Sequence, residues 1–390
     1  MAPVKVLHII QGFGPGGAET WLLAAVKYLR QHPELNLQFD FLATGGEKLL
    51  FDDEVAAQGC KIFYHKYSLK KFFQFRKQIK KILTANSYTA IHNHQDFIAG
   101  WHFLAAGSEL PAMRITHLHN PYNFVYNYVT NPARWFSFKA GRWLMQRYTT
   151  KITGTSAAVM DEYGYNKQPY VRKRVTPAYC GFDVTNFTFQ AAAKKEICNE
   201  FNWDAAEINI GLFTGRIGLQ AYDTAKNQKN PEFAFAIAKE LVIKNNKWRF
   251  ILAGYKGNLG AEMENELLQL NLQHKIILAG FRNDIPVLMS AASVLLFPSE
   301  WEGLGMVAVE AQANGLPVLM SDTVPAEAII FPEIVLKKKL SDGKKSWADT
   351  IDALVNKTAA NDRVTFAEKT ISSPFSIQSS VAGLIKLYKA

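Results

Sequence analysis

A chain of 390 residues, 48% hydrophobic and 20% charged, exceeds what one hydrophobic core usually supports, so two globular domains are expected. No apolar run approaches about 18 residues, which argues against a membrane span, and no signal-peptide pattern is visible, which argues against secretion. The three cysteines are widely separated, which argues against a disulfide framework. The net charge of +10 is uneven, because residues 1–180 hold 22 Lys and Arg against 11 Asp and Glu, which indicates an anionic partner for the first half alone.

Apolar segments and helical patterns alternate along the first half of the chain. Strands are predicted at residues 4–10, 37–45, 61–66, 88–94, 113–120 and 148–156. Helices are predicted at residues 18–31, 69–85 and 97–107.

The second half repeats this alternation. Its predicted strands are residues 208–215, 248–254, 275–281, 293–299 and 316–322. Its predicted helices are residues 231–244, 260–272, 284–291, 304–314 and 345–357. Near-continuous apolar strands between amphipathic helices are typical of parallel sheets covered on both faces, so we expect two doubly wound α/β domains. Ligands bind beyond the carboxyl ends of such strands, so two facing domains would enclose a cleft.

The loop after the first strand has the spacing of a dinucleotide-binding fingerprint. Gly12, Gly14 and Gly17 match G-x-G-x-x-G, which raises the possibility of an oxidoreductase. That function also needs an acidic residue at the tip of the second strand to hold the ribose. Glu47 comes too late in the chain and Asp40 falls inside the strand, so the dinucleotide interpretation is not favoured.

Two strands of the first half end in pairs of histidines. Period-two alternation puts His92 and His94 on one side of the sheet, and His117 and His119 likewise. Four imidazoles with Asp96 nearby could bind zinc. Hydrogen bonding of the histidines within the sheet is the other interpretation.

Residues 66–83 form a basic, aromatic flank with seven Lys and Arg. At helical spacing an apolar arc is expected, made of Leu69, Phe72, Phe73, Phe75, Ile79 and Leu83. Lysines 70, 71, 77 and 81 fall on the other side. Such a helix suits an anionic membrane surface, and a core-packed helix with a solvated basic face explains it equally well. Residues 121–148 add further basic residues among many aromatics, and no nucleic-acid-binding module is visible.

The segment "FPSEWEGLGMVAVEAQANGLPVLMSD" (297–322) ends one strand, turns and opens a helix near Leu304. Gly303 and Gly305 would let the amides at the helix start approach an anion. Glu302 precedes the helix, and Glu310 lies about two turns inside it, where it could accept hydrogen bonds from a ribose. Taken singly, each glutamate could instead be a helix-start residue or a solvated one.

This segment resembles the Glu–seven residues–Glu signature of retaining glycosyltransferases of family 4, as found in bacterial exopolysaccharide and capsular enzymes. The resemblance implies a GT-B fold of two Rossmann-like domains. It implies an acceptor-side domain at 1–185, a nucleotide-sugar donor domain at 186–373, and a final helix at 374–390 that returns to the first domain. Segments "GPGGAE" (14–19), "FTGRI" (213–217) and "QKN" (228–230) resemble further marks of the family, although the loop at 217–228 is longer than usual.

The resemblance also implies roles for individual residues. His119 and Glu302 would be catalytic, and His94 and Asp96 would line the acceptor side. The implied donor-binding residues are Gly16, Gly17, Arg216, Lys229, Arg282, Gly303, Leu304, Gly305, Met306, Val307 and Glu310.

The implied reaction is retaining transfer of a hexosyl group from a nucleotide-sugar, most simply a UDP-sugar, to a saccharide acceptor that is lipid-linked. Arg216 and Lys229 would stabilise the leaving diphosphate in place of a metal, so neither a metal nor a cofactor is expected. The expected partners are the donor, the acceptor and an anionic membrane surface, without nucleic acid, for a cytoplasmic protein at the inner face of the membrane. A nucleotide-sugar epimerase on the same fold and a non-catalytic sugar-nucleotide sensor are the alternatives.

Overall fold

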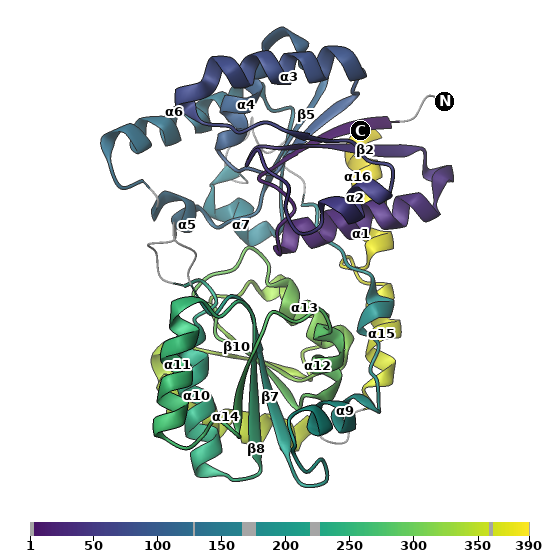
Figure 1. Ribbon diagram of the computed structural model, residues 1–390. Coiled ribbons are helices and arrows are strands. Elements are labelled where there is room, and N and C mark those ends of the chain that lie inside the picture. The colour runs from purple at the N-terminus through teal and green to yellow at the C-terminus, as the bar shows by residue number, and fades with distance from the viewer. Residues whose placement is uncertain (1–3, 128, 166–176, 219–226, 359–361, 390) are drawn as a thin grey trace. The chain divides into compact units, whose positions relative to one another are not determined.

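The computed structural model describes residues 4–127, 129–165, 177–218, 227–358 and 362–389. The chain divides into two compact units, each built around one sheet (Figure 1). The first unit contains Met1–Phe182 together with Pro374–Ala390, and the second contains Asp183–Ser373.

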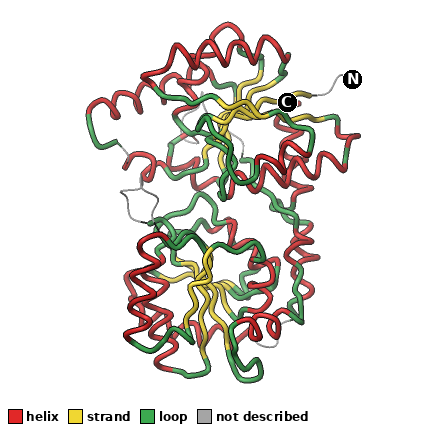
Figure 2. The backbone as a smooth tube through the Cα atoms, in the orientation of Figure 1, coloured by secondary structure: helices red, strands yellow, loops and turns green. Residues whose placement is uncertain are grey.

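The first unit has a six-stranded parallel sheet with helices on both faces (Figure 2). From edge to edge its strands are β3 (Ile62–Tyr64), β2 (Leu37–Ala43), β1 (Val4–Ile10), β4 (Ala90–Asn93), β5 (Met113–Leu118) and β6 (Lys151–Gly154). Its helices are α1 (Gly17–Gln31), α2 (Asp52–Ala57), α3 (Phe72–Asn86), α4 (Ile98–Ala106), α5 (Tyr122–Asn127), α6 (Pro132–Tyr148), α7 (Ala157–Glu162) and α16 (Ile377–Lys389).

Helix α16 joins the first unit although it comes last in the chain. It packs against α1, where Trp21 Nε1 donates a 2.9 Å hydrogen bond to Ser380 Oγ. Both partners are nearly buried, so this bond satisfies two polar groups inside the apolar contact between the helices.

Helix α6 is absent from the predicted elements. It begins at Pro132, directly after Asn131, whose side chain accepts a 2.9 Å hydrogen bond from the backbone N–H of Arg134. Asn before Pro is a strong helix-start signal. The dense aromatic and basic residues that follow concealed it, because they show little helical periodicity.

The basic helix α3 differs from the prediction in which residues it buries. It begins at Phe72, because Leu69–Lys71 form a 3-10 turn. Phe75 and Ile79 face the core, but Phe73 is 82% exposed and Leu69 is 45% exposed. Phe73 lies about 200° around the helix from Phe75, so the two cannot share a face, and the expected apolar arc was too wide.

The second unit has its own six-stranded parallel sheet. From edge to edge its strands are β12 (Val335–Lys338), β11 (Val318–Ser321), β10 (Val294–Phe297), β7 (Asn209–Thr214), β8 (Trp248–Ala253) and β9 (Ile276–Gly280). Its helices are α9 (Ala193–Glu200), α10 (Pro231–Lys244), α11 (Gly257–Gln269), α12 (Ile285–Ala291), α13 (Met306–Ala313), α14 (Gly343–Thr358) and α15 (Val364–Ile371). The two parallel sheets confirm the predicted α/β class, while β12, α9 and α15 were not predicted.

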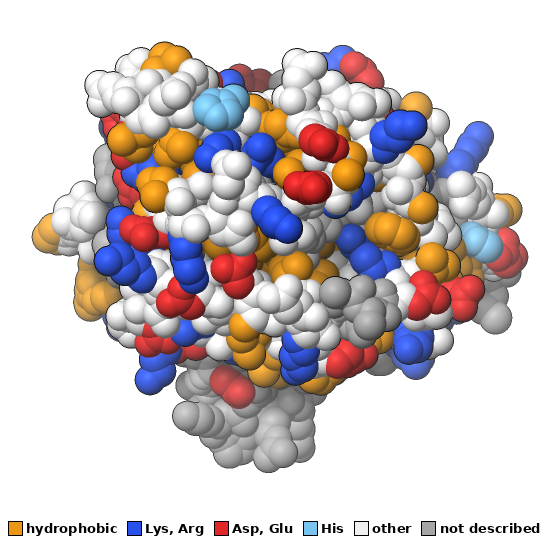
Figure 3. Space-filling model, turned by 90° about the horizontal axis from the view of Figure 1, so that it is seen from below, with side chains coloured by type: hydrophobic (Ala, Val, Ile, Leu, Met, Phe, Trp, Pro, Cys, Tyr) orange, Lys and Arg blue, Asp and Glu red, His pale blue; other side chains and the backbone are white. Residues whose placement is uncertain are grey.

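Charged side chains of both signs lie on the surface of the molecule. On the face drawn in Figure 3, basic and acidic side chains alternate without a large area of one sign. None of the helices that the structure describes combines the length and the apolar character needed to cross a bilayer.

Candidate functional site

The predicted donor residues of the second unit gather where its strands end. Glu302 follows β10 and is 7% exposed. Its Oε1 lies 2.6 Å from Lys229 Nζ, and its Oε2 accepts a 3.4 Å hydrogen bond from Gln228. The Lys229 ammonium also lies 5.0 Å from the centre of the Phe297 ring. A buried carboxylate therefore has a cation and an amide as its partners, as a buried charge requires.

The turn before α10 places Lys229 beside this carboxylate. Asn230 takes a left-handed conformation with φ 52° at the helix start. Asn227 donates hydrogen bonds to the carbonyls of Arg216, at 3.1 Å, and Ile217, at 3.0 Å. These bonds tie the turn to the end of β7, where Arg216 has an exposed side chain. Most of the long loop between Arg216 and Lys229, residues 219–226, lies outside the described residues.

Helix α13 begins two residues later than predicted. Gly305 has φ 95°, a left-handed conformation that side chains rarely adopt, so the helix starts at Met306 rather than at Leu304. Leu304 is 3% exposed and packs into the core, whereas Met306 and Val307 are half-buried. The first amides of a helix have no intrahelical acceptor, which suits this turn to an anionic group.

Glu310 lies on the same helix, and its side chain is half-buried. Removal from water raises the pKa of its carboxyl to about 7, and the positive charge of Lys229 opposes that rise. Lys229 thus acts electrostatically on both signature glutamates.

Arg282 follows β9 and is held by two acids. Its guanidinium bonds Asp284 at 2.6 and 2.7 Å and also Glu200. These carboxylates raise the pKa of Arg282 above its usual value. Its guanidinium is therefore engaged by Asp284 and Glu200, so we expect the backbone of this loop, rather than the Arg282 side chain, to contact a donor.

In the first unit, Gly16 and Gly17 begin helix α1 directly after the glycine loop. A Cβ added to Gly17 would meet nothing within 4 Å, so this glycine leaves open space at the helix start. Asp40 lies in the middle of β2, where it accepts hydrogen bonds from the Lys61 amide at 2.9 Å and the Tyr88 hydroxyl at 2.8 Å. Asp40 cannot hold a ribose there, which agrees with setting the dinucleotide interpretation aside.

Five histidines lie together on one face of the first sheet, over β1, β4 and β5. His8 joins the four that the alternation had placed on one side, since it pairs in register with His92. Ring nitrogens of neighbouring histidines are 2.9 Å apart between His8 and His94, 2.9 Å between His94 and His119, and 3.2 Å between His92 and His117. Burial lowers the pKa of every one of these imidazoles, so all five are neutral near pH 7.

Asp96 stands beside the cluster. Its carboxylate accepts bonds from the His119 backbone N–H at 3.0 Å and the Asn120 side chain at 2.9 Å. Burial raises the pKa of Asp96 to about 6, while those two bonds counteract the rise. Asp96 therefore holds the backbone of His119 in place through this hydrogen bond.

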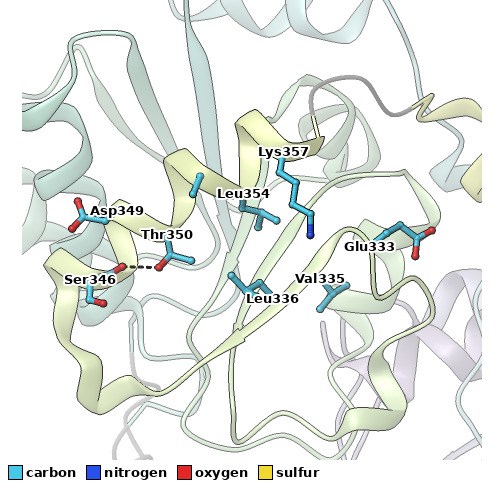
Figure 4. A pocket seen from close by; sticks show the side chains of 9 residues that line it. Glu333, Val335, Leu336, Ser346, Asp349, Thr350, Leu354 and Lys357 are labelled. Carbon is cyan, nitrogen blue, oxygen red and sulfur yellow. Dashed lines mark hydrogen bonds between the residues drawn. The ribbon is translucent and has the colours of Figure 1, made fainter.

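A hollow of about 360 Å³ lies elsewhere in the second unit, between β12 and α14 (Figure 4). Leu336, Thr350, Leu354 and Lys357 are among the side chains around it. None of the predicted site residues lines this hollow, so we do not assign donor or acceptor binding to it.

Two models of known protein families match this chain. Residues 15–186 match the family model described as Glycosyltransferase Family 4, and residues 217–371 match that of Glycosyl transferases group 1. The two matches follow the two units in chain order, although β1 lies before the first match and β7 lies before the second. The chain belongs to the GT-B glycosyltransferases. The transferase is 26% identical to EpsF of Bacillus subtilis (strain 168), a protein classed as a glycosyltransferase, over 98% of this chain and 96% of that protein.

Other relatives agree with this assignment. The transferase is 25% identical to the capsular polysaccharide biosynthesis glycosyltransferase CapH of Staphylococcus aureus, over 91% of each chain. Its fold matches crystal structures of Anabaena HepE, one in complex with UDP and glucose, with a TM-score of 0.77 and 17% identity over 99% of this chain and 100% of that one. The predicted resemblance to exopolysaccharide and capsular enzymes of GT-B fold is thus confirmed.

The sequence did not indicate that His8 belongs to the histidine cluster or that Tyr388 contacts it. His8 is a single histidine in an apolar strand, and only the pairing of β1 with β4 brings it opposite His92. Tyr388, whose hydroxyl lies 2.6 Å from His92 Nδ1, comes from α16 at the far end of the sequence. Alternation within β1 could have suggested His8, but no local signal points to Tyr388.

Proposed function

We propose that this transferase moves a hexosyl group from a UDP-sugar to a lipid-linked saccharide acceptor in the synthesis of a surface polysaccharide or exopolysaccharide. The observation that carries the proposal is the ion pair between the half-buried Lys229, just before α10, and the buried Glu302, just before α13. HepE, bound to UDP or UDP-glucose in its crystal structures, supports a UDP-linked donor. An Escherichia coli galactosyltransferase named for UDP-Gal and a GlcNAc-diphosphoundecaprenol acceptor is 38% identical over 133 residues, 33% of this chain, and supports a lipid-linked acceptor.

The mechanism we propose retains the anomeric configuration and uses no metal. The leaving diphosphate takes the proton of the incoming hydroxyl on the same face of the sugar, so the protein must stabilise negative charge that develops on the phosphate. Lys229, Arg216 and the first amides of α13 supply that stabilisation without reorganising. Glu302 orients the sugar hydroxyls, and Glu310 accepts hydrogen bonds from the ribose. His119 contacts the reacting sugar.

The donor assignment is tested by calorimetry with UDP, GDP and a panel of UDP-hexoses, each with excess EDTA and again with Mg²⁺. We expect UDP or a UDP-hexose to bind with equal affinity in both conditions. Binding that requires Mg²⁺ or Mn²⁺ would refute the metal-free site, and preference for GDP would refute the uridine donor.

We also propose that the first unit docks on an anionic membrane. Helices α3 and α6 flank α4, since Trp101 of α4 contacts the Phe72 ring and donates a hydrogen bond to the Ser137 carbonyl. Large apolar side chains on these two helices face solvent, namely Phe73 (82% exposed), Trp135 (48%), Phe136 (64%) and Trp143 (63%). Exposed basic side chains accompany them, namely Lys70, Lys71, Lys77, Lys81, Arg134, Lys139 and Arg147. Exposed aromatics among cations are typical of surfaces that bind anionic lipid headgroups.

Vesicle sedimentation tests this surface. Lys70, Lys71, Lys77 and Lys81 are replaced together by glutamine, and the control carries four glutamines at exposed lysines of the second unit, Lys195, Lys339, Lys345 and Lys357. The first variant should lose binding to phosphatidylglycerol vesicles and keep its UDP affinity, whereas the control should bind vesicles like the wild type. Equal binding by all three proteins at low salt would show that the basic face is merely solvated.

A further inference from the structure

The five clustered imidazoles form two rows rather than a single convergent group. In the first row His8 Nδ1 faces His94 Nε2, and His94 Nδ1 faces His119 Nε2, each at 2.9 Å. The His8 and His94 rings are nearly parallel, at 12°, with centroids 5.2 Å apart, which is the spacing of two rings joined edge to edge by one hydrogen bond. The first row therefore runs as a chain of hydrogen bonds from β1 through β4 to the end of β5.

The second row runs beside the first. It joins the Tyr388 hydroxyl to His92 Nδ1, at 2.6 Å, and His92 Nε2 to His117 Nδ1, at 3.2 Å. The rows stack face to face, with His92 on His94 at 4.4 Å and His117 on His119 at 4.3 Å between ring centroids. The second row contacts the first through ring faces, without a hydrogen bond to His119 among the described contacts.

A row of neutral imidazoles has only two proton arrangements. Each neutral ring carries one N–H and one bare nitrogen. If His8 Nδ1 is the donor, His94 Nε2 must accept, so the proton of His94 is on its Nδ1. That N–H then donates to His119 Nε2. His119 then carries its own proton on Nδ1. In the opposite arrangement every ring is protonated on Nε2, and His119 Nδ1 is a bare nitrogen.

The far end of the row selects between these arrangements. His8 Nε2 is fully buried and has no hydrogen-bond partner within the described part of the chain. The opposite arrangement would leave a buried N–H at this position without a hydrogen-bond acceptor. The neighbouring Phe39 and Phe41 rings, with centroids 4.2 and 5.4 Å from that of His8, offer only weak acceptors. An orphaned N–H is the rarer and more costly defect in protein interiors, so the bare nitrogen is favoured at His8 Nε2.

We infer that the row His8–His94–His119 fixes the proton of His119 on Nδ1, and that His94 is thereby a positioning residue for transfer. His119 then presents a hydrogen-bond donor, rather than a base, at the carboxyl end of β5. A donor suits a sugar hydroxyl oxygen or an oxygen that gains negative charge. Both ring nitrogens of His94 are engaged within the row, so His94 acts through His119 instead of touching the acceptor. The role in transfer rests on the proposed function, whereas the proton position does not.

Long-range ¹H–¹⁵N correlation spectra of the ¹⁵N-histidine-labelled full-length protein report the proton position in each ring. The His119 signals are assigned by their loss in His119→Gln. We expect His8, His94 and His119 all to carry the proton on Nδ1, which is not the tautomer that free histidine prefers. A proton on Nε2 of His119, or a mixture of the two tautomers in the wild type, would overturn the inference.

Two variants separate positioning from structural support. His94→Phe breaks the row, so His119 should show both tautomers, kcat should fall about three- to tenfold, and KM for the donor should change little. His92→Phe is the matched control, because it makes the same ring replacement in the same core without touching the hydrogen bonds of the first row. It should keep the His119 tautomer and turn over within about twofold of the wild type, relative to its folded fraction.

Other results of these experiments would contradict the inferred role of His94 or separate it from the proposed function. Equal losses of kcat in both variants, with the His119 tautomer unchanged, would reduce His94 to a packing residue. Loss of the ring N–H signals on adding one equivalent of Zn²⁺ would show a metal site instead, since nitrogens of His8, His92 and His94 lie within 4.8 Å of one another. If His94→Phe does not fold, the wild-type spectrum still decides the proton position. If no transfer is found in any assay, the spectra still decide the row while the proposed function fails.

Discussion

Ionisation of Glu310 should lower the free energy of unfolding as pH rises, and replacing Glu310 by glutamine should remove this loss. Removal from water raises the pKa of this carboxyl from 4.5 to about 7. A folded-state pKa above the unfolded one means that the native state binds more protons between those two values, so stability falls as pH rises through this window. Glu310→Gln removes the titration and keeps the shape of the side chain.

The size of the effect follows from these two pKa values. Between pH 5.5 and pH 8.5 the wild type should lose about 2 kcal/mol of folding free energy through Glu310 that the variant does not lose. For a unit of the size of Asp183–Ser373 this difference corresponds to a relative gain of about 4–8 °C in Tm for Glu310→Gln at the higher pH. The effect is an upper value, because the side chain is partly exposed.

The assay is thermal unfolding of both proteins without ligand at several pH values, followed by the difference in Tm at each pH. All other titrating groups are common to both proteins, so they cancel in that difference. Glu310→Gln should therefore gain stability relative to the wild type as pH rises. A difference independent of pH, or one that moves the other way, would refute the account of a buried, proton-binding Glu310. The same variant should bind UDP more weakly, because the carboxylate accepts the ribose hydroxyls.

Three further predictions concern Glu310, Glu302 and Lys229. Glu310→Ala should weaken UDP binding about ten- to 150-fold by calorimetry, the contribution of one charged hydrogen bond, and unchanged affinity would remove Glu310 from the ribose. Glu302→Gln should keep UDP affinity and lose turnover, since it orients only the reacting sugar; normal turnover would show that this carboxylate is not catalytic. Lys229→Met should cost about 3–5 kcal/mol in denaturant unfolding, because Glu302 then stays buried without its cation, and a loss below about 1 kcal/mol would contradict the ion pair as described.

Most of the fold could be predicted because buried parallel strands and amphipathic helices repeat along the sequence. Helix α10 matches its expected bounds, residues 231–244, since Pro231 and the apolar pattern mark both ends. Helix α13 was predicted to begin too early, because the apolar Leu304 fits a helical pattern. The left-handed conformation of Gly305, which excludes Leu304 from the helix, is seen only in the structure. Phe73 shows the same limit, since its hydrophobicity says nothing about which side of α3 it takes.

The candidate site could be predicted residue by residue only where a family motif spans it. Glu302 and Lys229 form an ion pair and the Lys229 charge acts on Glu310, while the roles of these three residues in donor binding stay predictions. Arg282 shows what a motif leaves out, because the acids that hold it come from α9 and from its own loop. The histidine rows depend on strand register and on α16, which is contributed from the other end of the chain. Long-range pairing of this kind leaves no local pattern in the sequence.

The proposed reaction is a retaining, metal-independent transfer from a UDP-sugar to a lipid-linked acceptor. The most direct test incubates the protein with UDP-hexoses and diphosphoundecaprenol-linked saccharides in excess EDTA, and follows the anomeric proton of the product by NMR. We expect a glycosylated lipid with the same anomeric configuration as the donor, formed at the same rate with and without Mg²⁺. An inverted product, or transfer that appears only when Mg²⁺ is restored, would contradict it.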